Sequence, residues 1–303
     1  MKGIIYLVIL LALFSFQESK AQELLQNTLY VFNRQLINPA VVGTNDDLTA
    51  TLNHREQWVN FDGNPSTSFF TMSGKLPYNL GGGISLFHDK HGVWNHSGAL
   101  LDLAYKIRLD MDGTMLSFGL KSELSVLNVD YNKLSKQVDP VEEQGVENKF
   151  DFNQGVGAIV YNSKYYAGLS VMSLIKSAAE SSEFSGLWNK TTFCLMGGYL
   201  WDINSAVKFK PSVLFRAVKH MPLAVDVNAN FKLFNKLWIG AVYRLNTAIG
   251  ANAVFNLTPK LKVGYAYDFY TNRLNLINSG AHEIMLSYRF SLNGKGNSNP
   301  IYF

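Results

Sequence analysis

The chain has 303 residues, of which 47% are hydrophobic and 13% aromatic, and its formal net charge is only +4. This near balance, without a basic face, excludes a typical nucleic-acid-binding protein. The single cysteine, Cys194, excludes an internal disulfide, and its apolar surroundings favour a packing role over a nucleophilic one.

The N-terminus has the features of a secretory leader. Lys2 is followed by an almost continuous apolar run from Ile4 to Phe16, and Ser19 and Ala21 supply the small residues of a cleavage site. We therefore expect a signal peptide over 1–21 and a mature start at Gln22. The alternative is an uncleaved anchor helix, but the run is shorter than the roughly 20 residues that a membrane span needs. No second run of that kind follows, which excludes a helical membrane protein.

Strands with two different faces follow the leader. In 101–110, apolar residues alternate with mostly polar ones, and a strand points successive side chains to opposite faces. In an exported protein this pattern predicts an all-β, closed, antiparallel up-and-down barrel of about 14 strands in the outer membrane, with its apolar face toward lipid. The predicted strands are 48–58, 65–75, 80–89, 97–109, 114–127, 151–161, 164–172, 189–201, 205–216, 223–233, 236–245, 248–257, 260–270 and 281–291.

The domain organisation follows from these elements. We expect 22–46 to be an N-terminal periplasmic or plug segment, 47–291 the barrel, and 292–303 a polar C-terminal tail. Short links, such as the one with the hairpin dipeptide Asp112-Gly113, alternate with longer ones. Outer-membrane barrels have tight periplasmic turns and longer extracellular loops, so the short links and both termini are assigned to the periplasm.

The alternation also predicts which charges face the lumen. These are Asp102, Lys106, Arg108, Asp226, Lys262, Asp268, Glu283 and Arg289. The five tryptophans fall at or near strand ends, where aromatic girdles belong, namely Trp58, Trp94, Trp188, Trp201 and Trp238. Pro211 cannot donate to a ladder, so a bulge or an unpaired position is expected there.

The sequence does not define a catalytic site or a metal site. Three histidines, His88, His91 and His96, cluster around a loop, but their spacing matches no standard zinc pattern. The sequence therefore neither establishes nor excludes a metal site there. The glycine-rich stretches open no predicted helix and so lack a phosphate-binding end. We expect no cofactor and no enzyme activity. A barrel hydrolase is the remaining alternative, because spacing alone does not determine which lumen side chains are neighbours.

A series of short motifs runs along the mature chain. Residues 30–43 carry Tyr30–Asn33 and Ile37–Gly43, and His54–Pro65 contains an element of the form R-x-Q-W-x-x-F-x-G-x-P. Later motifs are Gly83–Ser85, Asp89–Gly92, Ala104–Ile107, Leu116–Lys121, Lys210–Ser212, Gly264–Asp268 and Ser279–Leu286. In this order, and over nearly the whole mature chain, these segments resemble the PorP/SprF membrane proteins of the type IX secretion system.

This resemblance implies a non-enzymatic outer-membrane barrel, associated with gliding motility, that supports export or surface display of large adhesin-type cargo. It also implies periplasmic and outer-membrane partners from the secretion machinery, besides lipid. The candidate partner-contact or plug residues are Asn38, Pro39, Gly43, Arg55, Trp58, Asp62, Gly63 and Pro65. Their structural alternative is that Pro39 and Gly43 set turns, Trp58 anchors a rim and Arg55 pairs with lumen acids. The rival function is a porin-like or hydrophobic-solute channel.

Overall fold

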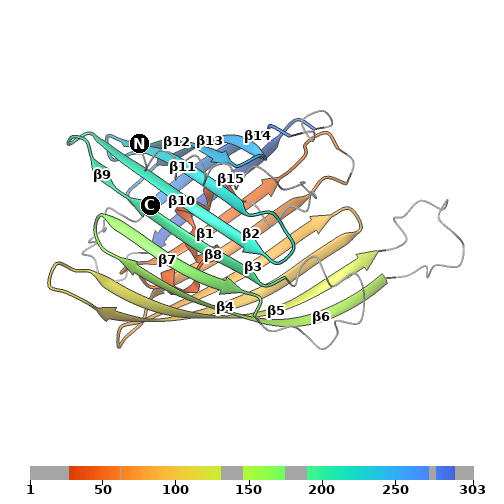
Figure 1. Ribbon diagram of the computed structural model, residues 1–303, viewed down its shortest axis with the longest axis horizontal. Coiled ribbons are helices and arrows are strands. Elements are labelled where there is room, and N and C mark those ends of the chain that lie inside the picture. The colour runs from red at the N-terminus through yellow and green to blue at the C-terminus, as the bar shows by residue number, and fades with distance from the viewer. Residues whose placement is uncertain (1–26, 62, 131–145, 175–189, 273–277, 291–303) are drawn as a thin grey trace, which may run out of the picture.

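The computed structural model describes residues 27–61, 63–130, 146–174, 190–272 and 278–290. The expected signal peptide, Asp62, Trp188 and the expected C-terminal tail lie outside these ranges. The described chain forms one antiparallel sheet (Figure 1). Its strands are β1 (Leu48–Glu56), β2 (Ser66–Lys75), β3 (Leu80–His91), β4 (Trp94–Arg108), β5 (Met115–Asp130), β6 (Val146–Tyr161), β7 (Tyr165–Met172), β8 (Thr192–Tyr199), β9 (Trp201–Asp202), β10 (Val207–Val218), β11 (Ala224–Leu233), β12 (Leu237–Arg244), β13 (Ala248–Asn256), β14 (Leu261–Tyr270) and β15 (Ala281–Phe290).

The sheet closes on itself. Strand β15 pairs with β1, and β10 pairs with both β8 and β11, so the described sheet returns to its starting strand. Strands β8 and β9 both pair with β10 and act as one strand interrupted at Leu200. Counted in this way, the barrel has 14 strands, and the predicted fold class is confirmed.

Pro211 lies beside this interruption. The ladder between β10 and the β8–β9 strand passes from the Phe209–Trp201 pair to the Ser212–Gly198 pair. In this ladder Lys210 and Pro211 have no register partner, although Pro211 pairs in register with Ala229 on the β11 side. The expected unpaired position is therefore present on one side of the strand, because proline has no N–H to donate.

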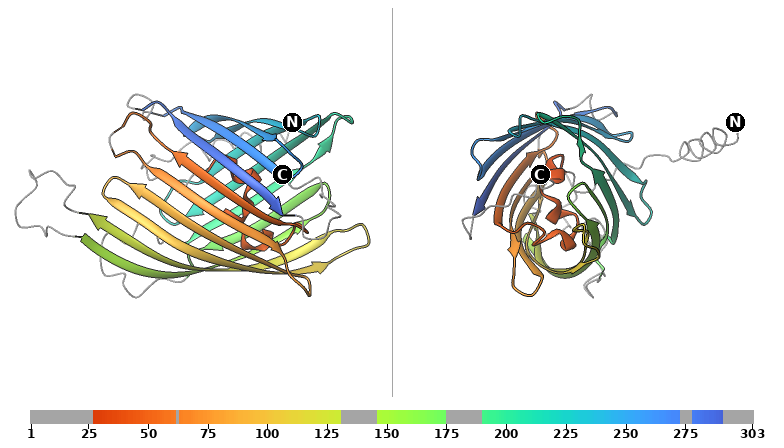
Figure 2. Two further views of the ribbon diagram at one scale, coloured as in Figure 1. Left: turned by 180° about the vertical axis from the view of Figure 1, so that it is seen from behind. Right: turned by 90° about the vertical axis from the view of Figure 1, so that its left-hand side faces the viewer.

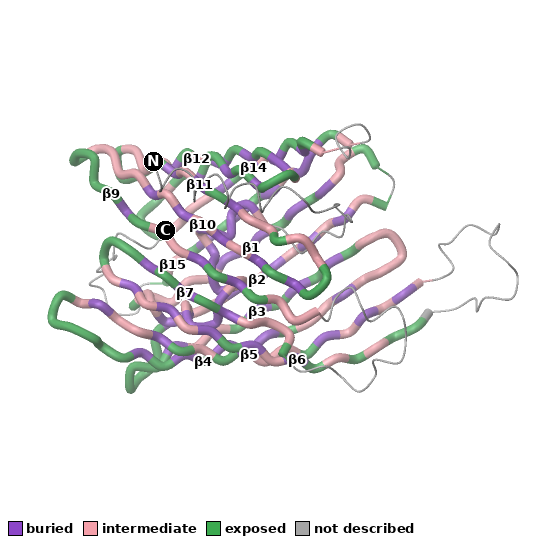
Figure 3. Tube along the Cα trace, viewed as in Figure 1, coloured by how far each residue is buried: buried purple, intermediate pink, exposed green. Residues whose placement is uncertain are grey.

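The two faces of the strands differ as predicted (Figure 3). On β4 the side chains of Leu101, Leu103 and Tyr105 are 47–54% exposed on the outside, whereas Asp102 and Lys106 are buried inside. The alternation therefore gives the barrel an apolar outer surface suited to lipid. No helix in the described part of the chain is long and apolar enough to cross a membrane.

Tryptophan placement departs from the expected girdle. Trp201 is 63% exposed, and Trp58 and Trp94 are partly exposed near strand ends. Trp238 is fully buried and faces the lumen, where its ring packs edge-on against Phe32 with centroids 5.9 Å apart. The girdle expectation is wrong for Trp238, because its place in β12 puts it on the inward parity.

The two rims of the barrel differ in their connections. The short-turn rim carries the links 76–79, 109–114, 162–164, 203–206, 234–236 and 257–260. The long-link rim at the other end carries 57–65, 173–191 and 271–280. The connection between β3 and β4 at this rim is short, because both strands extend further than predicted and only Gly92 and Val93 join them. Gly92 has a φ of +57°, which glycine adopts without strain and which permits this tight turn.

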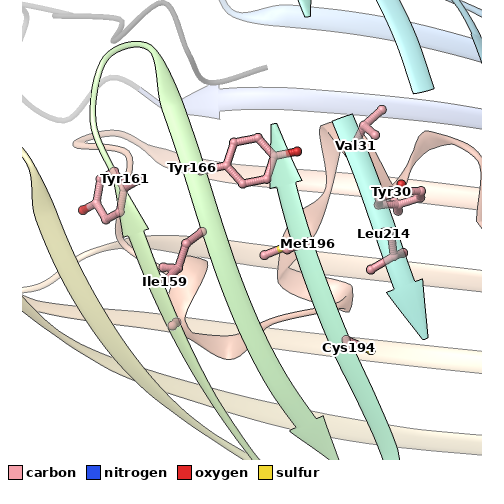
Figure 4. Close-up of a cluster of buried hydrophobic side chains, with 9 residues drawn as sticks. Tyr30, Val31, Ile159, Tyr161, Tyr166, Cys194, Met196 and Leu214 are labelled. Atoms are coloured by element: carbon pink, nitrogen blue, oxygen red, sulfur yellow. The ribbon is translucent and has the colours of Figure 1, made fainter. Parts of the chain in front are cut away.

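The N-terminal segment lies inside the barrel. Its three 3₁₀ helices are η1 (Leu29–Phe32), η2 (Arg34–Leu36) and η3 (Pro39–Val41), drawn in red and orange within the ring of strands in Figure 2. We call residues 27–44 the lumen segment. Its apolar side chains form a core with the inner wall, in which Tyr30, Val31 and Ala40 meet side chains of β6, β7, β8 and β10 (Figure 4). Cys194 belongs to this core and is buried.

Candidate functional site

The lumen segment is shaped by its own sequence around Asn38. The side-chain oxygen of Asn38 accepts a hydrogen bond from the backbone N–H of Ala40 at 2.9 Å, and Pro39 occupies the first position of η3. Asparagine at the cap and proline in the first turn are the residues that favour a helix start. Gly43 then turns the chain toward β1 with a φ of +69°. Residues 38–43 are buried, apart from Val41, which is partly buried.

A buried ion network holds the start of the lumen segment near the long-link rim. Arg55 on β1 lies 2.7 Å from the Asp268 carboxylate on β14 and 3.5 Å from the Glu283 carboxylate on β15. Arg244 on β12 lies 2.8 Å from the same Asp268. All four side chains are at most 2% exposed. Charges this deeply buried are stable only when paired and hydrogen-bonded.

Thr28 binds directly to this network. Its backbone N–H donates to Glu283 at 2.6 Å, and its hydroxyl donates to Asp268 at 2.7 Å. Arg244 in turn donates to the Thr28 hydroxyl oxygen at 2.6 Å. The network thus joins strands far apart in the chain to the first turn of the lumen segment.

The network continues along the wall to Tyr30. Asp226 on β11 lies 3.1 Å from Arg216 and 3.7 Å from Arg244. Next to it, Asn228 donates to the Tyr30 hydroxyl at 2.8 Å.

The middle of the lumen segment binds β3, β4 and β5. The Gln35 amide donates to Asp102 at 3.0 Å and to Ser85 at 3.1 Å. Lys121 donates to the Gln35 carbonyl at 3.1 Å and pairs with Asp102 at 3.1 Å. One lumen charge pair is therefore shared with the backbone and side chain of η2.

Hydrogen bonds to backbone carbonyls fix the end of the lumen segment. Some of these carbonyls belong to strands of the wall and one belongs to the segment itself. The Asn38 amide donates to the carbonyls of Ala158 on β6 and Leu169 on β7, at 3.1 and 3.0 Å. Lys106 on β4 donates to the Gly43 carbonyl near the short-turn rim. The lumen segment therefore passes through the barrel from the neighbourhood of one rim to the other.

Glycines in the wall make room for this segment. A Cβ at Gly119 would meet the backbone of Pro39 and Ala40, and one at Gly81 would meet the carbonyl of Val42. These positions allow backbone to approach backbone, which is a common reason for glycine inside a strand.

The predicted site residues fall into separate places. Asn38, Pro39, Gly43 and Arg55 come together at the lumen segment, as do Asp102, Lys106, Asp226, Asp268 and Glu283. Lys262 and Arg289 are inward-facing but lie at the short-turn rim, and Arg108 is exposed at the end of β4. Its position next to a turn explains why Arg108 is not enclosed like Lys106.

The remainder of the Arg55–Pro65 element lies in the link between β1 and β2. Trp58 packs against a buried cluster of Ala248, Tyr270 and Ala281, and Pro65 accepts a backbone hydrogen bond from Gln57 at 2.9 Å. Gly63 is exposed with a φ of +75°. These residues lie at the long-link rim, away from the lumen segment.

The three histidines do not converge on one point. His88 is exposed on the outer face and contacts Ser97 at 2.8 Å, whereas His91 contacts the buried Asp89 at 2.8 Å. His96 is buried against the ring of Phe87. Within the described ranges, no group of three histidine, cysteine or acidic side chains is arranged to hold a metal.

Sequence reasoning missed several residues that hold the lumen segment. They are Thr28 and Gln35 in the segment itself, Lys121 and Arg244 on the wall, and Arg216, which pairs with the Asp226 of the ion network. Arg216 and Arg244 lie on the inward parity of their strands, and that signal was available. Chemically, the site can hold a peptide segment by charge-assisted hydrogen bonds.

Comparisons with known proteins found one matching family and several solved structures of low sequence identity. The model of the family "Type IX secretion system membrane protein PorP/SprF" matches residues 19–288. No relative was found among the curated proteins. Among solved structures, the chain is similar to a Pseudomonas aeruginosa FadL homologue, with 11% identity over 90% of this chain and 96% of that one and a TM-score of 0.47. It is also similar to Omp33 of Acinetobacter baumannii, with 10% identity, 82% and 100% coverage and a TM-score of 0.47. For the KdgM porin the identity is 8%, the coverage 80% and 99%, and the TM-score 0.42. The family match spans most of the chain, which therefore belongs to the PorP/SprF family of type IX secretion system membrane proteins.

Proposed function

We propose that this protein is a non-enzymatic outer-membrane component of type IX secretion that supports export or surface display of large adhesin-type cargo. In this role it anchors periplasmic partners and is associated with gliding motility. Membership of the PorP/SprF family supports the secretion role, and the closed barrel with an apolar outer face supports an outer-membrane location.

The observation that carries this proposal is the occupied lumen. The lumen segment is bonded to inward residues of strands around the barrel, including Glu283 on β15, Asp102 on β4 and Leu169 on β7. A barrel filled in this way is suited to anchoring and docking rather than to passing solutes. In this proposal Asn38, Pro39, Gly43 and Arg55 hold the lumen segment, while Trp58, Gly63 and Pro65 shape the first link of the long-link rim for partner contact. Asp62, which lies outside the described residues, is a further candidate for partner contact.

The proposed arrangement in the membrane follows from the two rims. A leader over 1–21 directs export, residues 22–46 form the plug, and the barrel is inserted with its short-turn rim toward the periplasm. The long-link rim then faces outward, where cargo is displayed.

The rival function, a porin-like or solute channel, is distinguished by conductance. In planar bilayers the purified protein is expected to be silent, because the lumen segment fills the barrel. A stable open channel of solute size would favour the rival.

The secretion role itself is tested in cells. Deleting the gene is expected to leave cargo that carries type IX signals unsecreted, while uptake of small solutes stays normal, and the wild-type gene restores export. Unaltered cargo export in the deletion strain would reject the proposal.

A further inference from the structure

Four basic side chains lie at one level inside the short-turn rim. Lys208, Lys232, Lys262 and Arg289 are each the second residue from the short-turn end of their strands, β10, β11, β14 and β15. Each falls on the inward parity of its strand and is partly exposed. We call these four residues the basic rim.

The basic rim contains like charges in direct apposition. Lys208 and Lys232 are register partners across the β10–β11 ladder and share the inner face. Like charges directly opposite each other destabilise a sheet. Lys232 has no ion pair with any described residue; its ammonium lies 5.6 Å from the ring centroid of Trp238 and within electrostatic reach of Arg289.

Among the described residues, fewer acids than bases lie near the basic rim. Lys208 pairs with Asp202 at 2.7 Å, with Asp202 54% exposed, and Arg289 lies 4.0 Å from Asp47. Two further lysines, Lys236 and Lys260, are exposed in the adjoining turns. At the other end of the lumen, the buried ion network has three arginines, Arg55, Arg216 and Arg244, matched by three acids, Asp226, Asp268 and Glu283. Charge is therefore balanced within this ion network, whereas the described residues of the short-turn rim carry an excess of positive charge.

We propose that the basic rim binds an acidic, extended polypeptide segment of a periplasmic partner. This inference rests on the proposed function, which places the short-turn rim in the periplasm. From β10 to β15 the site crosses five strand spacings, or about 24 Å. An extended chain covers that span with roughly seven residues, whereas one phosphate group does not. The four side chains face the lumen side of the wall, which favours a soluble partner over lipid headgroups.

The test is direct binding to the full-length protein in detergent. A fluorescent decapeptide of glutamate is titrated and followed by anisotropy, with a glutamine decapeptide and inorganic phosphate as comparison probes. The glutamate peptide is expected to bind, and 0.5 M NaCl is expected to weaken binding, because partly exposed charge pairs are screened. Equal binding of the glutamine peptide, tight binding of phosphate alone, or no binding would overturn the proposal.

A matched pair of triple variants locates the site. The first variant combines Lys208→Gln, Lys232→Gln and Lys262→Gln. It is expected to weaken peptide binding about tenfold, since each partly exposed charge pair contributes modestly. The control variant combines Lys75→Gln, Lys164→Gln and Lys219→Gln. It removes the same charge from positions outside the basic rim and should bind as the wild type does. Equal losses in both variants would show a non-specific charge effect and refute the basic rim.

Thermal unfolding separates binding from folding. Removing apposed lysines is expected to leave the unfolding midpoint unchanged or raise it, as at sites where function opposes stability. A lowered midpoint would make these lysines structural and overturn the inference. The peptide assay does not require secretion: unaltered cargo export in a deletion strain rejects the proposed function alone, and failed peptide binding rejects the basic rim alone.

Discussion

The guanidinium of Arg55 and the carboxylate of Asp268 lie 2.7 Å apart and join β1 to β14 across the intervening strand β15. Both side chains are at most 1% exposed. Replacement by Arg55→Met leaves buried carboxylates short of one positive charge, and we expect it to lower the free energy of unfolding by about 3 kcal/mol. Urea unfolding in detergent, followed by tryptophan fluorescence, measures the change.

A surface ion pair provides the control for Arg55. Lys75 lies 3.1 Å from Asp46, with side chains 49% and 66% exposed. Exposed pairs contribute little, so Lys75→Met is expected to change the same free energy by less than about 1 kcal/mol. Equal effects of the two substitutions would mean that the buried ion network does not stabilise the barrel.

The hydroxyl of Thr28 fixes the start of the lumen segment to the ion network. Thr28→Val removes its bond to Asp268 and the acceptor for Arg244 while keeping the side-chain shape. Hydrogen bonds to charged groups contribute about 1.5–3 kcal/mol, so the segment should detach at least about tenfold more often. We expect brief openings in planar bilayer recordings of this variant. Thr247→Val, on an exposed link, should stay as silent as the wild type; openings in both variants would contradict the assignment.

The faces of the strands could be predicted because strand geometry leaves each side chain only two choices. Leu101 and Asp102 were therefore placed on the correct sides of the wall from alternation alone. The same parity puts Trp238 inside the barrel, whereas its position near a strand end predicts a girdle; in β12 the parity decides, and Trp238 is buried.

The partners of the lumen segment could not be predicted in this way. Residues 27–44 carry no strand or helix period, and their contacts are distant in sequence, with 255 positions between Thr28 and Glu283. Such pairs depend on how the sheet closes and on the register of every strand, which spacing along one strand does not determine. The carboxylates Asp268 and Glu283 were predicted to face the lumen, but nothing in their own strands indicates Thr28.

The side chain of Asn38 should not tolerate an acidic replacement. Its amide donates to the carbonyls of Ala158 and Leu169, and Asn38→Asp would put a carboxylate oxygen against those two carbonyl oxygens. We expect a loss of about 2–3 kcal/mol at pH 7, larger than for Asn38→Ala. In the folded variant we expect the pKa of the new carboxyl group to be raised, because the protonated acid can donate a hydrogen bond to one of the two carbonyls. The protonated form is thus favoured in the folded state, so the penalty shrinks as pH falls through that pKa. Urea unfolding at pH 7 and pH 5, each compared with the wild type, measures this; a deficit that grows toward acid would contradict it.

Two wall glycines differ in what lies opposite them, and this difference tests the fit of the lumen segment. A Cβ at Gly119 would collide with the backbone of Pro39 and Ala40, whereas one at Gly197 would have its nearest neighbour, the Tyr166 carbonyl oxygen, at 3.6 Å. Backbone cannot yield as a flexible side chain can, so Gly119→Ala is expected to cost about 1–3 kcal/mol and to displace η3. Gly197→Ala should be neutral or slightly stabilising, since alanine loses less backbone freedom on folding. Unfolding in urea measures both free energies, and bilayer conductance should rise for Gly119→Ala alone. If both variants behave alike, close packing of η3 against β5 does not hold the lumen segment in place.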